Sequence, residues 1–440
     1  MIVESGRIEV LERGRRPLIF GPADSDLHVT VRVNGPGFWR SLLRGSLGLA
    51  ESYAEGVWDC DDLVTLVRIG AREMPRLDRL RRPFAPLAAL ASRVPRNTRE
   101  RTPRHIAAHY DLGNELFSLF LDETMTYSSA YFERSGMTLL EAQEAKLDLA
   151  CRKLELRPDD HLLEIGTGWG SMAVHAASHY NCRVTTTTVS REQHAAAVER
   201  VRRAGLEDRV TVLLEDYRDL RGRYDKLVSI EMIEAVGWQY FDTFFSHCSD
   251  LLAPEGLMLL QAIVIEEDAY EVEKAAKSFA NTLVFPGGCL PSLGTIDRCV
   301  QRSTELTPLH REDLTADYAE TLRRWRERFL VSEHRARELG YDDRFRRLWD
   351  LYLSYSEGGF IERRIGATQI LLAGASYRES RVNMRSEIAS SRNAGPREAS
   401  LASEVFPPEP STCWSDSMAC TTFAAQSSGD VSSQAEGSTP

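Results

Sequence analysis

Hydrophobic and polar positions follow two alternating periods through the middle of the chain. Short apolar runs predict strands, and apolar residues that recur every three to four positions between them predict helices. The predicted helices include 139–154, 172–177 and 191–204, and the last ends at Gly205, as helix C-termini often do. The predicted strands are 162–165, 183–189, 210–213, 227–230 and 257–264. This alternation predicts an α/β fold with a mostly parallel sheet covered on both faces.

The two ends of the chain have different patterns. Residues 27–33 read as a strand, and helical patterns follow near 39–49 and 63–69. From about Arg385 the chain is rich in Ser, Ala, Thr, Glu and Pro without periodicity, so it cannot bury enough apolar surface to offset its ordering entropy. We therefore predict an N-terminal α+β domain over residues 1–100, a main domain over 101–384 and a disordered tail over 385–440.

Composition and charge narrow the class of protein. A chain of 440 residues with a formal net charge of −11 is not typical of a general nucleic-acid binder, so we expect no nucleic-acid partner. The eight cysteines are scattered, with no CxxC pair and no Cys/His cluster at metal spacing, so we expect no metal. The chain starts without a signal-peptide pattern and holds no apolar run of membrane-spanning length. We expect a cytoplasmic protein.

One segment could dock on a membrane surface. Between Arg72 and Arg104 the chain has ten arginines and three acids, with apolar residues between them. Such a segment could bind an anionic membrane peripherally. It could equally be a solvated linker, because Pro83, Pro86, Pro95 and Pro103 interrupt it. Both interpretations stay open.

The stretch LLEIGTGWGS, residues 162–171, predicts a nucleotide site. A strand with one acid, Glu164, is followed by the alternating glycines Gly166, Gly168 and Gly170 and then by a helix. Glycines here allow the backbone to approach a ligand beside the N-terminus of a helix. The spacing is GxGxG, and residues 184–190 lack the acid that a dinucleotide site wants on its next strand, although Glu192 follows. We therefore predict S-adenosylmethionine, in preference to a dinucleotide or a plain packing turn.

Four polar segments fall at or just beyond the predicted strand ends. They are residues 166–170, 188–193, 216–217 and 231–234. Because ligands of such sheets bind beyond the carboxyl ends of the strands, we expect these segments to form one site.

Several longer motifs carry a resemblance to a known family. They are HYDLGNELF (109–117), TMTYSSAYF (124–132), TTVSREQ (187–193), EMIEAVGWQYFDTFF (231–245) and VFPGGCLPS (284–292). With the glycine segment, and over roughly residues 105–378, the chain closely resembles the cyclopropane-fatty-acyl-phospholipid synthases and mycolic acid cyclopropane synthases. The resemblance implies a class I S-adenosylmethionine methyltransferase fold with a Rossmann-like sheet and helical lipid-binding insertions. It also implies transfer of a methyl group to a cis double bond of a phospholipid acyl chain, with loss of a proton as a cyclopropane closes.

The resemblance assigns cofactor-binding residues. Tyr127 and Ser128 would close over the cofactor, and residues 163–171 would hold its methionine moiety. Residues 188–193 would lie by the ribose, and Asp216 with Tyr217 would face the adenine. The individual residues that we expect to bind S-adenosylmethionine are Tyr127, Ser128, Glu164, Gly166, Gly168, Gly170, Thr188, Ser190, Gln193, Asp216 and Tyr217.

The chemistry implied by the family asks for an unusual environment. Attack of an alkene on a sulfonium methyl leaves a carbocation, which needs a dry apolar pocket, aromatic faces and one base. Residues that could supply the walls are Phe279, Phe285, Tyr318, Trp325, Tyr352 and Phe360.

In the family, the base is thought to be a bound bicarbonate. Carried over to this chain, its ligands are Glu234, Tyr318 and the backbone of Ile263. Two further ligand positions depart from the pattern: Ser129 replaces a cysteine that acts through its backbone, and Gln261 replaces a histidine. Glutamine can donate a hydrogen bond to an anion but cannot shuttle a proton.

Alternatives to cyclopropane formation stay open. Proton loss from the neighbouring carbon would give a methylene-branched chain, which a reductase partner would later convert to a methyl branch. A further alternative is methylation of a small O or N nucleophile. A non-catalytic relative that binds lipid and cofactor, inactive through Ser129 and Gln261, is also open. The sequence leaves the oligomeric state undecided, with a homodimer among the options.

Overall fold

The computed structural model describes residues 3–85, 113–274 and 276–378. These residues belong to one compact unit that contains two sheets. The predicted domain boundary near residue 100 and the predicted disordered tail lie outside the described residues, so both stay predictions.

The larger sheet has seven strands in the order β10-β11-β9-β8-β5-β6-β7. Strands β5 to β9 pair in parallel, whereas β11 pairs antiparallel with both β9 and β10. The predicted mostly parallel sheet is therefore confirmed, with an antiparallel pair added at one edge. The strand bounds are β5 His161–Ile165, β6 Arg183–Thr188, β7 Val210–Leu214, β8 Tyr224–Ile230, β9 Leu252–Ile265, β10 Thr307–Asp313 and β11 Ile365–Ala373.

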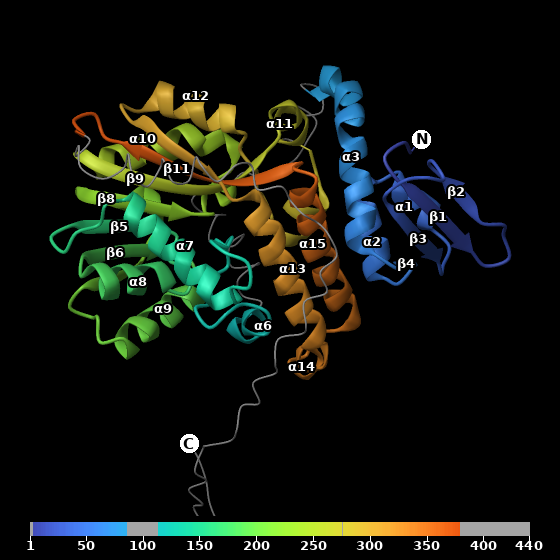
Figure 1. The fold of residues 1–440 in the computed structure, drawn as a ribbon, viewed down its shortest axis with the longest axis horizontal. Coiled ribbons are helices and arrows are strands. Elements are labelled where there is room, and N and C mark those ends of the chain that lie inside the picture. Colours follow the sequence, from blue (N-terminus) through green and yellow to red (C-terminus); the bar gives the residue numbers. More distant parts are fainter. Residues whose placement is uncertain (1–2, 86–112, 275, 379–440) are drawn as a thin grey trace, which may run out of the picture. The chain divides into compact units, whose positions relative to one another are not determined.

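Helices cover both faces of this sheet (Figure 1). Successive strand residues point to opposite faces, so Leu162 packs in one apolar core and Leu163 in the other. The core around Leu162 is covered by α7 (Leu139–Lys153), α8 (Ser171–Tyr180) and α9 (Arg191–Arg203). The core around Leu163 is covered by α10 (Phe241–Leu251) and α12 (Leu293–Ser303).

Local chemistry fixes where the helices begin. Thr138 and Glu141 form a capping box at the start of α7. Ser190 caps α9 by accepting a hydrogen bond from the backbone N–H of Gln193, and Gly205 follows the end of that helix as predicted. The Ser190 cap fixes the start of α9 just after the carboxyl end of β6, and α8 begins after the glycine turn that follows β5.

A smaller sheet in the N-terminal region has the order β2-β1-β3-β4. Its strands are β1 Arg7–Glu12, β2 Leu18–Phe20, β3 His28–Val33 and β4 Trp58–Cys60. The strand predicted over 27–33 is confirmed as β3, but the helix predicted over 39–49 is two helices, α1 (Phe38–Leu42) and α2 (Gly45–Ala54). The predicted helix is interrupted between α1 and α2 because Gly45 has a left-handed backbone with φ 62°. The helix predicted over 63–69 extends further, as α3 (Leu63–Arg81).

Ion pairs join α3 to the longest C-terminal helix, α15 (Asp343–Ile361). Arg68 Nε lies 2.8 Å and Arg72 Nε 2.7 Å from the carboxylate of Glu362, which follows α15. The remaining described elements are η1 Arg82–Phe84, α6 Asn114–Ser118, η2 Tyr217–Asp219, η3 Ile233–Ala235, η4 Trp238–Tyr240, α11 Glu267–Glu273, η5 Ala280–Val284, α13 Thr315–Val331 and α14 Glu333–Glu338.

Candidate functional site

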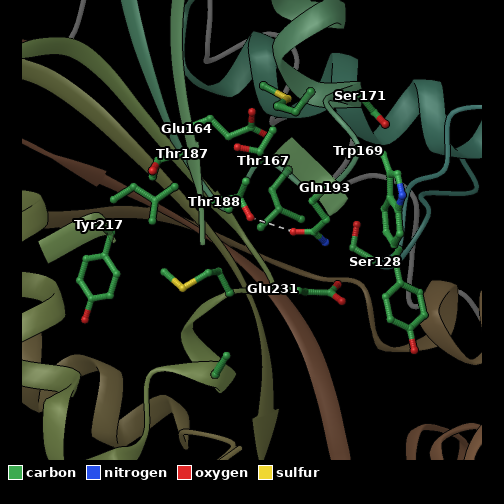
Figure 2. Close-up of a pocket in the computed structure, with 18 of the residues that line it drawn as sticks. Ser128, Glu164, Thr167, Trp169, Ser171, Thr187, Thr188, Gln193, Tyr217 and Glu231 are labelled. Carbon is green, nitrogen blue, oxygen red and sulfur yellow. Dashed lines mark hydrogen bonds between the residues drawn. The ribbon is translucent and has the colours of Figure 1, made fainter. Parts of the chain in front are cut away.

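A cavity of about 160 Å³ opens at the carboxyl ends of β5, β6, β7 and β8 (Figure 2). Each of the four polar segments that the sequence placed at strand ends contributes to its lining. The predicted cofactor residues on the lining are Tyr127, Ser128, Glu164, Gly166, Gly168, Thr188, Gln193, Asp216 and Tyr217. Gly170 and Ser190 are not on the lining.

The glycine turn between β5 and α8 leaves room where a ligand must approach. A Cβ atom added to Gly168 would meet no atom within 4 Å, and its φ of 53° is a left-handed conformation. A Cβ added to Gly170 would instead lie 3.2 Å from Ala197 in α9. Gly168 therefore keeps the cavity open, and Gly170 lets α8 and α9 pack closely.

A buried acid and a buried amine face this cavity. Glu164 Oε2 accepts a hydrogen bond from Thr186 Oγ1 at 2.6 Å, and burial raises the pKa of its carboxyl to about 8. Lys146 Nζ donates to Ser128 Oγ at 2.8 Å. Burial lowers the pKa of Lys146 to about 8, against the opposing effect of Glu231, Asp122 and Glu164. Lys146 was not among the predicted site residues, although a lysine on the buried face of α7 is a signal that could have identified it.

The loop after β6 is held by its own side chains. Thr188 Oγ1 donates to Gln193 Oε1 at 2.9 Å, the bond drawn in Figure 2. Ser190 contributes through capping, because its hydroxyl accepts the N–H of Gln193 at 3.2 Å. Ser190 thus shapes the loop from outside the cavity.

At the end of β7, Asp216 and Tyr217 contact Arg218. The Asp216 carboxylate lies 2.6 Å from the Arg218 guanidinium, which is also 5.7 Å from the centre of the Tyr217 ring. The ring of Tyr217 packs edge-on against Phe244 with centroids 5.5 Å apart. An aromatic face and an anchored acid therefore border this side of the cavity.

An aromatic cluster adjoins the cavity through Tyr127. Its hydroxyl lies 3.0 Å from that of Tyr352, and its ring centroid lies 5.2 Å from that of Trp325. The six aromatic residues that the sequence proposed as walls all belong to or pack against one apolar cluster: Phe279, Phe285, Tyr318, Trp325, Tyr352 and Phe360.

The residues that the resemblance assigns to bicarbonate binding contact two different carboxyl groups, those of Glu231 and Glu234. The Glu231 carboxylate accepts hydrogen bonds from Ser129 N at 2.9 Å, Gln261 Nε2 at 2.8 Å and Tyr318 OH at 2.7 Å. Glu234 Oε1 accepts the N–H of Ile263 at 2.5 Å, and its buried Oε2 has no hydrogen-bond partner. Glu231 lines the cavity. The five residues that the resemblance assigned to bicarbonate do not: Ser129, Glu234, Gln261, Ile263 and Tyr318.

The two carboxyls also differ in their electrostatics. Burial, followed by the charge of Glu231, raises the pKa of Glu234 to about 8. Burial also raises the pKa of Glu231, but the hydrogen bonds from Tyr318, Ser129 and Gln261 act in the opposite direction. Glu231 is therefore the carboxyl that this environment equips to carry charge.

The described residues offer neither a metal site nor a membrane-spanning helix. Among residues 3–85, 113–274 and 276–378, no group of His, Cys, Asp and Glu is arranged to hold a metal ion. Within the same ranges, no helix combines the length and apolar character needed to cross a membrane.

Comparisons with known proteins identify the family of this chain. The sequence profile of the mycolic acid cyclopropane synthetase family matches residues 97–370. Cyclopropane-fatty-acyl-phospholipid synthase of Escherichia coli K12 is 38% identical over 363 residues, which cover 81% of this chain and 89% of that one. Tuberculostearic acid methyltransferase UfaA1 of Mycobacterium tuberculosis is 38% identical over 327 residues, covering 72% of this chain and 76% of that one.

Solved structures give the same fold. The cyclopropane synthase MmaA2 from Mycobacterium tuberculosis has a TM-score of 0.58 and 31% identity, covering 62% of this chain and 98% of that one. The mycolic acid cyclopropane synthase CmaA1, solved with SAH and CTAB, has a TM-score of 0.58 and 33% identity over the same shares. The predicted class I methyltransferase fold is thereby confirmed, together with the smaller N-terminal sheet.

Proposed function

Because the chain belongs to the mycolic acid cyclopropane synthetase family, we propose that it acts on an unsaturated phospholipid. It is an S-adenosylmethionine-dependent methyltransferase. The reaction adds a methylene group across a cis double bond of an acyl chain and forms a cyclopropane. The observation that carries this proposal is one cavity that joins a cofactor-type glycine turn to a buried carboxylate and an aromatic cluster.

The cavity fits S-adenosylmethionine, which supplies an electrophilic methyl group on a cationic sulfur. The open space at Gly168 admits the ligand. Burial raises the pKa of Glu164, and a bound cation would favour the ionised form of its carboxyl, which then offers negative charge to the sulfonium. Thr188, Gln193 and Asp216 offer polar contacts to a ribose or base edge, and Tyr217 offers an aromatic face. Tyr127 and Ser128 close the remaining side.

The aromatic cluster fits the second substrate. A carbocation formed on an acyl chain must be kept from water and is stabilised by aromatic faces. Tyr318 lies in this cluster, with its ring tilted against that of Phe360 at a centroid distance of 4.4 Å, and also donates to Glu231 on the cavity wall. The solved complex of CmaA1 with CTAB shows that this relative accommodates a long alkyl chain.

The direct test uses purified protein, S-adenosylmethionine and vesicles of a phospholipid with cis-monounsaturated acyl chains. We expect a lipid that has gained one CH₂ unit and that shows cyclopropane protons in its NMR spectrum. Cofactor binding without any lipid product would instead favour the non-catalytic relative. Methylation of a small O or N nucleophile in the same mixture would overturn the proposed substrate class.

A second product is favoured by one specific observation. The similarity to tuberculostearic acid methyltransferase UfaA1 suggests a methylene-branched chain, made by the same first step and then reduced by a partner enzyme. Vinylidene protons in the NMR spectrum of the product would identify this outcome. A reductase partner and a homodimer stay predictions.

Bicarbonate as the base would require free hydrogen-bond donors. The N–H of Ser129 and the O–H of Tyr318 carry one hydrogen each, and both already bond to Glu231. A second anion at this place would also lie beside two carboxyls, which like-charge repulsion disfavours. The residues of this chain therefore do not fit a bound bicarbonate.

We also propose peripheral contact with the membrane through the end of α3. Leu80, near the end of α3, is 67% exposed, and Phe84, in the short helix η1 that follows, is 65% exposed, with arginines close by in the sequence. Arg81 pairs with Glu273 and Arg82 with Asp268, each at 3.2 Å, so the segment carries less free positive charge than its sequence indicates. Insertion of the two apolar side chains is then the main expected contribution. The rest of the arginine-rich segment lies outside the described residues.

A further inference from the structure

Three donors from three separate parts of the chain converge on one carboxylate. Ser129 lies in the loop before α7, Gln261 in β9 and Tyr318 in α13, and each donates to Glu231 at 2.7–2.9 Å. A carboxylate and a bicarbonate present the same planar pair of oxygens. The side chain of Glu231 thus takes the hydrogen bonds that the family resemblance gives to bicarbonate.

The backbone at Glu231 adopts an unfavourable conformation. Glu231 has a left-handed φ of 51°, which is uncommon for a residue other than glycine. Its N–H donates to the carbonyl of Gln261 at 2.8 Å, which fixes the residue at the end of β8. Strained residues of this kind persist where surrounding structure holds them, and they concentrate at functional sites.

A second layer of residues orients the Gln261 amide. Gln369 Nε2 donates to Gln261 Oε1 at 2.9 Å, and Lys153 Nζ donates to Gln369 Oε1 at 2.6 Å. The oxygen of Gln261 is therefore engaged by Gln369, and its NH₂ group is directed to Glu231. This explains why glutamine at position 261, where the family resemblance expects histidine, suits a resident carboxylate.

We propose that Glu231 is the general base of the reaction and replaces bicarbonate in this chain. The proposal rests on the proposed function. After methyl transfer, the carbocation on the acyl chain is neutralised when Glu231 removes a proton from the added methyl group. The electrons of that C–H bond form the third bond of the ring, and Glu231 becomes a neutral acid that returns its proton to water.

The charged and titratable groups around Glu231 support this role. Tyr318 faces it from α13, Lys146 acts on it from α7, and Glu234 interacts with it from η3. Burial raises the pKas of both Glu231 and Tyr318, so the tyrosine stays protonated and donates to the carboxylate. A raised carboxyl pKa makes a stronger base at neutral pH. In Figure 2 the Glu231 side chain extends toward Ser128 across the cavity.

Two variants at this position separate the resident base from bicarbonate. Glu231→Gly removes the carboxylate, suits the left-handed backbone and frees the donors on Ser129 and Tyr318. Glu231→Gln removes the charge but keeps the volume filled. Both variants should bind S-adenosylmethionine in calorimetry, which confirms that they fold.

Turnover is then measured in buffer depleted of carbon dioxide, with and without added bicarbonate. We expect the wild-type rate to be the same in both buffers and both variants to be slower by roughly 10²–10⁴-fold, the usual contribution of a general base. Added bicarbonate should restore part of the activity of Glu231→Gly and none of that of Glu231→Gln. It should also raise the melting temperature of Glu231→Gly without affecting the wild type.

The outcomes distinguish this proposal from the proposed function. A wild-type rate that falls on depletion and recovers with bicarbonate would overturn the role of Glu231 while leaving the function intact. Full activity of Glu231→Gly in buffer depleted of carbon dioxide would also overturn the role of Glu231 as the base and leave the proposed function intact. No lipid product from the wild type in air-equilibrated buffer would overturn the proposed function itself.

Discussion

Glu164 and Glu231 are both acids on the cavity wall, but their surroundings prepare them for different tasks. Glu231 accepts three hydrogen bonds, whereas one hydroxyl, that of Thr186, donates to the Glu164 carboxyl. Burial raises the pKa of Glu164 to about 8, so without a ligand its carboxyl is mostly neutral at pH 7. A cation placed beside Glu164 would favour its ionised form.

This difference predicts how cofactor binding depends on pH. Because Glu164 ionises as the pH rises through about 8, the affinity for the cationic S-adenosylmethionine should increase over that range and level off above it. Lys146 loses its charge near the same pH, which acts in the same direction. Calorimetry across this range should show a smaller increase for S-adenosylhomocysteine, which lacks the sulfonium charge. Parallel curves for the two ligands would contradict the assignment, and Glu164→Gln should flatten the difference between them.

The open space at Gly168 leads to a second prediction about S-adenosylmethionine binding. Gly168→Val places a branched side chain in the open space of the cavity, so S-adenosylmethionine binding should be lost. Gly205→Val is the matched control, because Gly205 also has a left-handed backbone, with φ 64°, and open space around its Cβ position, but does not line the cavity. Both variants should lose similar stability, roughly 1–2 kcal/mol from the left-handed backbone. Equal cofactor affinity in the two variants would show that Gly168 is not at the binding site.

Sequence patterns located most of the cavity segments, including residues 231–234, but they gave no role to Lys146 or to Glu231 itself. Lys146 occupies a position on the apolar stripe of α7, where a lysine is unexpected, and this departure from the pattern indicates a functional role. Glu231 stands three residues before Glu234 in the same motif. Which of the two acids meets Ser129, Gln261 and Tyr318 depends on the left-handed backbone at residue 231, and periodicity does not reveal a backbone angle.

At the scale of elements, the strongly periodic segments were predictable and the edge of the sheet was not. The predicted strand 257–264 is the C-terminal part of the longer β9 (Leu252–Ile265). Strand β10 contains a proline and four charged or titratable residues in TPLHRED, so its sequence resembles a loop. It becomes a strand because β11 offers it an antiparallel partner, which is a tertiary effect.

The junction between α3 and α15 gives a prediction about stability. Glu362→Gln removes the charge that pairs with Arg68 and Arg72 in a partly buried site. We expect denaturant unfolding to show a loss of about 1–3 kcal/mol, as for hydrogen bonds to charged groups. Glu338→Gln breaks one exposed pair with Arg335 and should cost at most about 1 kcal/mol. Similar losses in the two variants would mean that the junction contributes little.

The exposed end of α3 gives a prediction about membranes. Replacing both Leu80 and Phe84 with glutamine should weaken binding to anionic phospholipid vesicles by roughly tenfold or more, since each buried apolar side chain contributes about 1.5–3 kcal/mol. Cofactor affinity should not change. The control replaces Leu43 and Val331, which are 87% and 80% exposed elsewhere. Vesicle binding that weakens equally in both double variants, or in neither, would exclude this end of α3 as the membrane contact.

At the scale of the whole molecule, the sheet brings a methyl-donor site and a protected apolar environment together. The cavity lies at the carboxyl ends of the parallel strands, and the aromatic cluster receives residues from the N-terminal region, α13 and α15. Tyr318 links the two regions through its bond to Glu231. Methylation of an alkene needs this combination, because its carbocation must be shielded and then lose a proton.

The fate of the methyl hydrogens tests this account most directly. The purified protein is given S-adenosylmethionine with a fully deuterated methyl group and vesicles of a cis-unsaturated phospholipid, and the lipid product is analysed by mass spectrometry. Because a base removes one hydrogen isotope from the transferred methyl group, we predict that the product retains two of its three deuterons. A product that keeps all three, or a label found only on oxygen or nitrogen, would contradict proton abstraction and with it the proposed reaction.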